Sequence, residues 1–228
     1  MADAVRAVRR HGDAATQEIR RAARPRGASR RISRARANLL PSGDADVGGI
    51  RFDGGMTDVT LRPWADDDLD LLRRANTPEL MDQLGGPETD RQVRARHDRY
   101  LHLWHLGTAR QFRIVIPGHP EGVGVVGYWQ REWQGHPVLE AGWSVEAEYR
   151  GQGIASAAVR EMLEYARGDG ETLPVHAFPR VDNPPSNAVC RKAGFTLLGE
   201  ADFEVAPGRV LHTNDWVAEL TPGPHGPA

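Results

Sequence analysis

The chain has 228 residues, of which 39% are hydrophobic and 26% charged, as is ordinary for a globular protein. No apolar run approaches the roughly 20 residues that a membrane-spanning helix needs, and the N-terminus lacks the apolar core of a signal peptide. The single cysteine, Cys190, excludes a disulfide within the chain and a metal site built from several cysteines. We therefore expect a cytoplasmic protein with no membrane partner.

The net charge of −2 conceals an uneven distribution. Residues 1–55 carry 12 arginines and 6 acidic residues, a net charge of +6, which leaves −8 on residues 56–228. Phe52 is the only Phe, Trp or Tyr of the basic segment, which thus lacks the interleaved aromatics of single-stranded nucleic-acid sites. We predict a poorly ordered Arg-rich leader over 1–55, a folded domain over 56–220 and a disordered tail over 221–228, and we do not expect a nucleic-acid partner. Met56 is a candidate for the natural start.

The domain is predicted to begin with a strand and two helices. The strand covers 59–62, and the first helix, 66–75, has aspartates at its start and arginines at its end, as the helix dipole favours. The second helix begins at Thr89, which forms a capping-box pattern with Gln92, and ends at Gly107. Its buried face is predicted to consist of Val93, His97, Tyr100, Leu101 and Trp104.

Three antiparallel strands are predicted next, over 112–116, 123–129 and 138–145. Proline and glycine at 117–122 and at 135–137 mark the turns between them.

The second half of the domain alternates helices and strands. A helix over 154–167 is predicted to end at Gly168 and to bury Ile154, Ala158, Met162 and Ala166. A short strand follows over 175–178, and Asn183 then caps a helix that ends at Gly194. Strands over 195–203 and 209–220 form a final hairpin. The predicted fold class is α/β, a single mixed, mostly antiparallel sheet of about seven strands flanked by helices.

The turn between strand 138–145 and the following helix has the properties of an anion site. Gly151 and Gly153 allow turn angles and close approach of the backbone to a diphosphate, the N-terminus of a helix presents unpaired N–H groups, and Arg150 adds positive charge. A dinucleotide-binding fingerprint is an alternative, but it requires an early parallel βαβ unit, whereas the strands before this turn are predicted to be antiparallel. A turn that merely connects strand and helix is the structural alternative.

Three blocks resemble a known family. Arg150-Gly-Gln-Gly-Ile-Ala155 resembles the acetyl-CoA pyrophosphate loop, Q/R-x-x-G-x-G/A, of the GNAT superfamily of N-acetyltransferases. Glu140-Ala-Gly-Trp-Ser-Val145 before it, and Asn183-Pro-Pro-Ser186 with Cys190-Arg-Lys-Ala-Gly-Phe195 after it, are similar to the Rim-type branch, named for enzymes that acetylate ribosomal-protein N-termini. The resemblance covers about 59–220. It implies the acyl-CoA N-acyltransferase fold and, without a metal, direct transfer of an acetyl group from acetyl-CoA to a primary amine in a ternary complex.

The same resemblance implies roles for individual residues. Glu140 is the candidate general base, acting through water, with a solvent-exposed strand-edge glutamate as the alternative. Asn183 would hydrogen-bond the pantetheine arm and the Ser186 hydroxyl would lie near the thioester sulfur, although both also suit the start of a helix. A backbone N–H near Trp143 to Val145 would hold the oxyanion. The expected acetyl-CoA-binding residues are Trp143, Ser144, Val145, Arg150, Gly151, Gln152, Gly153, Ile154, Ala155, Ser156 and Asn183.

Other features have plainer explanations. Cys190 stands where many superfamily members have a general-acid tyrosine, and we predict that it packs rather than catalyses. His102 and His105 lack a third ligand for a metal. Three tryptophans either wall the acceptor pocket or pack in the core: Trp129, Trp133 and Trp143.

The acceptor is left open among an N-terminal peptide, an aminoglycoside and another small cationic amine, since the acidic domain favours a cation. The alternative function is a non-catalytic acyl-CoA-binding regulatory module that contacts nucleic acid through its leader. The sequence does not determine the oligomeric state, and a homodimer is an open alternative.

Overall fold

The computed structural model describes residues 57–81, 86–206 and 208–220. The predicted leader, the candidate start at Met56 and the predicted tail lie outside the described residues. Along the chain the elements are β1 (Thr60–Pro63), η1 (Asp66–Asp68), α2 (Leu69–Arg74), α3 (Pro78–Met81), α4 (Asp90–Leu106), β2 (Ala109–Ile116), β3 (His119–Trp133), β4 (His136–Val145), η3 (Ala147–Tyr149), α5 (Ile154–Gly168), β5 (Val175–Ala177), α6 (Pro184–Ala193), β6 (Thr196–Ala206) and β7 (Arg209–Ala218).

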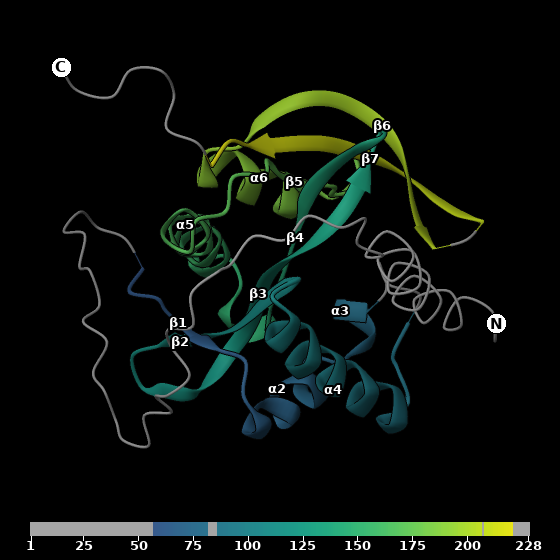
Figure 1. Cartoon of the computed structure of the whole chain (residues 1–228). Helices are drawn as coiled ribbons and strands as arrows, with labels where there is room; N and C mark the ends of the chain where they lie inside the picture. Colours follow the sequence, from purple (N-terminus) through teal and green to yellow (C-terminus); the bar gives the residue numbers. More distant parts are fainter. Residues whose placement is uncertain (1–56, 82–85, 207, 221–228) are drawn as a thin grey trace, which may run out of the picture. The chain divides into compact units, whose positions relative to one another are not determined.

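The strands form one seven-stranded sheet in the order β1-β2-β3-β4-β5-β7-β6 (Figure 1). Strands β1 to β4 pair antiparallel, β5 pairs antiparallel with β7, and β4 pairs parallel with β5. The predicted α/β class, with a mixed and mostly antiparallel sheet, is confirmed. The hairpin tip, Glu204–Val210, belongs to a different compact unit from the other described residues and is considered by itself. There the Gly208 N–H donates to the Glu204 carboxylate at 2.8 Å.

Helices cover both faces of the sheet, with α5 on one face and α2 and α4 on the other (Figure 1). On the α5 face a large core joins α5 and α6 to the central strands, because alternate strand side chains point to the same side. The predicted buried face of α5 is confirmed, since Ile154, Ala158, Met162 and Ala166 are at most 2% exposed. A smaller core lies on the opposite face, where Leu71, Leu72 and Val93 meet Val125 of β3.

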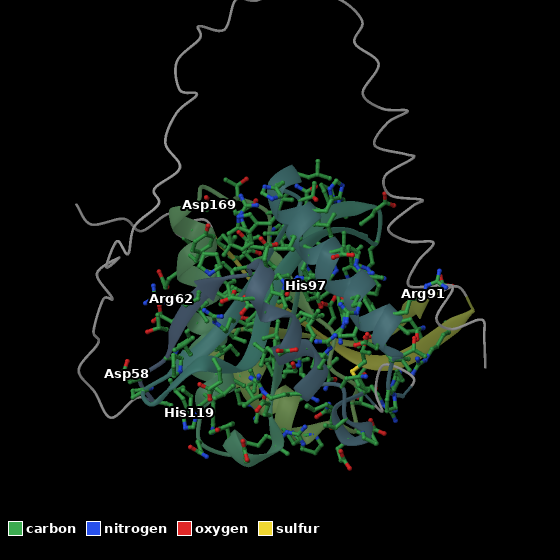
Figure 2. All side chains as sticks on the ribbon, turned by 90° about the horizontal axis from the view of Figure 1, so that it is seen from below. Asp58, Arg62, Arg91, His97, His119 and Asp169 are labelled. Atoms are coloured by element: carbon green, nitrogen blue, oxygen red, sulfur yellow. The ribbon has the colours of Figure 1, made fainter. Side chains whose placement is uncertain are left out.

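Helix α4 begins and ends where its local signals predict. The Thr89 N–H donates to Gln92 Oε1 at 2.8 Å, and Gly107 terminates the helix with a φ of 72°. His97 is buried and accepts a hydrogen bond from the Trp64 indole at 3.1 Å. In Figure 2, His97 lies near the middle of the view and Arg91, from the first turn of the same helix, lies at its edge. Of the predicted buried face, Val93 and His97 are buried, whereas Tyr100, Leu101 and Trp104 are partly buried and pack against the two cores.

Several boundaries differ from the sequence prediction. The predicted helix 66–75 is a 3₁₀ turn followed by α2, and the short α3 was not predicted. Gly168 lies inside α5, and the left-handed residue beyond its end is Gly170, with a φ of 84°. Strand β3 extends to Trp133, because its hairpin with β4 continues to a tight turn at Gln134 and Gly135. Within the described residues no helix is long and apolar enough to cross a membrane. The cytoplasmic location stays a prediction.

Candidate active site

The sheet opens between its two parallel strands. Strands β4 and β5 pair at two positions, Leu139 with Val175 and Glu140 with His176. Strand β5 ends one residue later, whereas β4 continues along β3 to Val145. Among the described residues, the side of β4 that faces β5 therefore has no strand partner over its last residues. Because the strands are parallel, the loops that follow them lie at the same end of the sheet.

The open side of β4 presents backbone donors. Successive residues of a strand direct their N–H groups to opposite sides, and the Leu139 N–H donates toward β5, to the carbonyl oxygen of Pro174, at 2.9 Å. The N–H groups of Trp143 and Val145 consequently point to the open side. The N–H of Ser144 points to β3, and its side chain lies on the face of α2 and α4. Of the predicted strand residues, Trp143 and Val145 thus provide the N–H groups on the open side.

The turn before α5 leaves a run of N–H groups unpaired. Gly151 and Gly153 have φ values of 76° and 82°, which place both residues in the left-handed region that favours glycine. The first backbone bond of the helix runs from the Ala157 N–H to the Gly153 carbonyl oxygen at 3.0 Å. In the described part of the chain, no acceptor receives the N–H groups of residues 151–156. The turn has the donor array that an anion requires.

Side-chain contacts hold this turn in place. The Arg150 Nε donates to the Val145 carbonyl oxygen at 3.2 Å, and the Thr57 hydroxyl donates to the Gln152 carbonyl oxygen at 2.6 Å. The Gln152 side chain donates to the Glu148 carbonyl oxygen at 3.2 Å. The first side chains of α5 pack against or into the protein interior: Ile154, Ala155 and Ser156. These three residues can therefore contact a ligand through their backbone.

Glu140 lies at the last paired position before the sheet opens. Its Oε2 accepts hydrogen bonds from the Arg131 guanidinium at 2.7 Å and from the Trp129 indole N–H at 3.0 Å. Both partners come from β3 and share the sheet face of α2 and α4 with Glu140. A Cβ on Gly142 would lie 2.9 Å from the Trp129 ring, so the glycine lets the indole lie across β4. The strand register fixes the orientation of the carboxylate.

The surroundings of Glu140 suit proton exchange. Its side chain is 14% exposed and ion-paired, so it is not the solvent-exposed glutamate of the alternative hypothesis. Burial raises the pKa of the carboxyl, while the charge and hydrogen bond of Arg131 and the hydrogen bond of Trp129 only partly oppose the shift. A carboxylate with a raised pKa is a stronger base than an ordinary glutamate.

The N-terminus of α6 follows β5 at the same end of the sheet. Asn183 Oδ1 accepts the Ser186 N–H at 3.2 Å, which confirms the predicted cap. Among the described residues, the amide protons of the Asn183 side chain and the hydroxyl of Ser186 have no hydrogen-bond partner. Capping uses the amide oxygen only, and leaves these groups for a ligand.

The residue that positions this terminus, Asn187, was missed from the sequence. It is 7% exposed, and its amide nitrogen donates to the carbonyl oxygens of Arg180 at 2.8 Å and Asn183 at 2.9 Å. Its amide oxygen accepts from the Asn214 side chain at 2.7 Å and the Trp216 indole at 2.9 Å. Asn187 therefore joins α6 to β7 and to the loop that carries Asn183.

Replacing Asn187 by alanine is expected to reduce the free energy of unfolding by about 2 to 3 kcal/mol, because buried partners lose their hydrogen bonds. Urea denaturation of the full chain measures this change. The control is Asn214→Ala, which removes one of the four bonds. Equal losses in the two variants would show that Asn187 does not organise the loop.

Cys190 packs in the core, as predicted. It is fully buried in the cluster on the α5 face, and burial raises the pKa of its thiol to about 12. The thiolate, which is the form that reacts, is therefore scarce at neutral pH.

Replacing Cys190 by alanine is expected to leave kcat within about threefold of the wild type, because a neutral buried thiol contributes packing and no proton. Steady-state assays check this. Iodoacetamide should alkylate the wild-type thiol only after unfolding. A hundredfold loss of kcat in a folded Cys190→Ala variant would contradict the assignment.

The three tryptophans lie on two different faces of the sheet, and the two histidines lie on α4. Trp129 and Trp133 lie on the face of Glu140, whereas Trp143 lies on the opposite face, so the three do not form one wall. His102 and His105 are exposed on α4. Over the residues that the structure describes, no three His, Cys, Asp or Glu side chains are grouped to hold a metal ion.

Comparison with known proteins identifies the family. The acetyltransferase (GNAT) domain family matches residues 58–196. The chain belongs to the GNAT acetyltransferase family. It is an acetyltransferase, and the resemblance inferred from its sequence blocks is confirmed. The ribosomal-protein-serine acetyltransferase of Escherichia coli (strain K12) is 29% identical over 136 residues, which are 58% of this chain and 71% of that protein.

Solved GNAT structures share the fold. The acetyltransferase from Salmonella typhimurium that modifies the N-terminal serine of ribosomal protein L7/L12 has a TM-score of 0.59 at 21% identity, over 73% of this chain and 97% of that one. Aminoglycoside acetyltransferase AAC(6')-Ib in complex with coenzyme A has a TM-score of 0.60 at 19% identity, over 71% of this chain and 95% of that one.

Proposed function

We propose that this GNAT protein transfers an acetyl group from acetyl-CoA to a primary amine. One observation carries the proposal: unpaired N–H groups at the start of α5 adjoin an open side of β4, and the largely buried Glu140 lies where that opening begins. A diphosphate fits the unpaired N–H groups, and an extended pantetheine arm fits the open side of β4. Glu140 provides a proton acceptor at the reacting end.

The co-substrate would be held by three sets of groups. The diphosphate would accept hydrogen bonds from the N–H groups of 151–156, with Arg150 adding charge. The pantetheine arm would lie along β4 and meet the free amide protons of Asn183. The thioester oxygen would accept a hydrogen bond from the N–H of Trp143 or Val145, which stabilises the oxyanion as it forms.

The reaction would proceed by direct attack in a ternary complex. The amine loses a proton to Glu140, and its nitrogen lone pair attacks the thioester carbonyl carbon. The carbon–sulfur bond then breaks, and the Ser186 hydroxyl donates a hydrogen bond to the departing thiolate. The residues named here require neither a metal nor a covalent intermediate on the protein.

Charge and relatives support a proposal for the class of acceptor. Residues 56–228 carry a net charge of −8, which favours a cationic substrate. The related enzymes include one that acts on ribosomal-protein serine and one named for aminoglycosides. We propose an N-terminal peptide amine, an aminoglycoside or another small cationic amine as the acceptor.

The test is thiol release from acetyl-CoA by the full chain, with mass spectrometry of the products. The amines are a synthetic peptide with N-terminal serine, kanamycin and spermidine. One acetylated product for each CoA released, from at least one of these amines, is the expected result. Tight CoA binding without turnover on any of the three would favour the non-catalytic module. Salt-sensitive RNA binding that is lost on deletion of residues 1–55 would then add a nucleic-acid role.

A further inference from the structure

A second buried acid–base pair lies next to Glu140. His176 Nδ1 and Asp215 Oδ1 are 2.7 Å apart, and the two side chains are 9% and 7% exposed. The other carboxylate oxygen of Asp215 accepts the Trp133 indole N–H at 2.9 Å. The imidazole ring stacks on Phe178, with 5.8 Å between ring centroids. Neither residue has a role in the acetyl transfer proposed for Glu140 and Ser186.

The pair has a defined hydrogen-bond polarity. An ionised carboxylate only accepts hydrogen bonds, and Asp215 already accepts one from Trp133. With an ionised Asp215, Nδ1 of His176 carries the proton and donates it to the carboxylate. Nε2 of the neutral ring then has a free lone pair, and it makes no hydrogen bond to any described residue. This is the arrangement in which an aspartate prepares a histidine to accept a proton.

The sheet register places His176 beside Glu140. Glu140 and His176 are direct partners across the parallel strands β4 and β5, so their side chains share one sheet face at a strand spacing of about 4.8 Å. This position is the last paired one before the sheet opens. Three charged groups face His176 from the surrounding strands: Glu140 from β4, Asp215 from β7 and Arg131 from β3, the last already paired with Glu140.

We propose that His176, oriented by Asp215, receives the substrate proton from Glu140. The ammonium N–H bond breaks and its electron pair stays on nitrogen for the attack, while the proton moves to the Glu140 carboxylate and then, through one intervening water, to His176 Nε2. The imidazolium is stabilised by Asp215 and loses its proton to solvent when the products leave. His176 and Asp215 act through Glu140, so they are positioning and relay residues. This inference rests on the proposed acetyl transfer.

The kinetic test uses His176→Gln and Asp215→Asn in the full chain. An asparagine at 215 can donate to Nδ1, which moves the ring proton to Nε2 and blocks the relay. Both variants are expected to lose at least about tenfold in kcat/KM at pH 7, because proton-transfer catalysis contributes 10²–10⁴-fold in total. The KM for acetyl-CoA should stay unchanged. The loss should diminish as the pH approaches the pKa of the amine, since the free amine then needs no base.

Matched controls separate the relay from packing. His136→Gln removes an exposed histidine of β4, and Phe178→Leu removes the stacked ring but keeps the acid–base pair. Both should keep near wild-type kcat/KM. No loss in the His176 and Asp215 variants, or a loss that is equal at every pH, would overturn the relay.

A second measurement is independent of turnover. In ¹⁵N-histidine NMR of the full chain, His176, assigned by comparison with His176→Gln, should show a protonated Nδ1 and a bare Nε2. Asp215→Asn should reverse this pattern. A proton on Nε2 in the neutral wild-type ring would overturn the inference even if no probe amine is acetylated. Failure of all three amines with the predicted tautomer present would refute the proposed function instead, and leave the orientation of His176 supported.

Discussion

Replacing Glu140 by glutamine is expected to lower kcat at pH 7 by about a hundredfold or more, which is the usual size of general-base catalysis. Glutamine keeps the shape and can still accept the Trp129 and Arg131 hydrogen bonds, but it cannot take a proton at neutral pH. Affinity for acetyl-CoA should change little, because the N–H groups of residues 151–156, which form the proposed diphosphate cradle, lie elsewhere. Initial rates with the best amine of the panel, together with CoA titration, measure the two effects.

The dependence of kcat/KM on pH should report the raised pKa of Glu140. Burial raises the pKa of Glu140 and Arg131 lowers it, so the acidic limb of kcat/KM should lie above the ordinary range of glutamate. Replacing Arg131 by methionine leaves only the Trp129 hydrogen bond to oppose the effect of burial, which should move this limb to higher pH. In Glu140→Gln the limb should disappear and the rate should follow the fraction of free amine.

The control for Glu140 is Glu132→Gln on β3, an exposed glutamate within the same hairpin. It should retain wild-type rates. Glutamine at 140 with full kcat across the pH range would remove Glu140 from the mechanism.

Features set by neighbouring residues were predictable from the sequence. Thr89 with Gln92 and the glycine at 107 defined α4, and Asn183 with its two following prolines defined the start of α6. Gly151 and Gly153 located the turn before α5, because left-handed angles need glycine. In each of these cases the signal lies within a few residues of the structure that it determines.

The partners of Glu140 were not predictable, because they depend on strand register. Trp129 and Arg131 reach the carboxylate across the β3–β4 hairpin, and a shift of one residue would place them on the other face. His176 and Asp215 are 39 residues apart and meet only because β5 and β7 are neighbours. A signal was present: His176 is a polar residue in an otherwise apolar short strand, and buried polar residues are informative.

Replacing Gly153 by valine is expected to raise the KM for acetyl-CoA by about tenfold to a hundredfold with a smaller change in kcat. The φ of 82° is strained for a β-branched residue, and the added Cβ would meet the Thr57 hydroxyl at 3.2 Å. A strain of about 1–3 kcal/mol can be relieved only by rotating the peptide units whose N–H groups form the cradle. Kinetics and calorimetric titration with CoA measure the loss.

Gly170 provides a matched control for this backbone strain. It has nearly the same φ, 84°, and its Cβ position is open, but it lies beyond the opposite end of α5. Gly170→Val should therefore reduce stability by a comparable amount while leaving the KM for acetyl-CoA unchanged. If both variants raise this KM equally, general destabilisation explains the effect. A change confined to Gly153→Val assigns the diphosphate to the turn, because only that turn couples the strained peptide to free N–H groups.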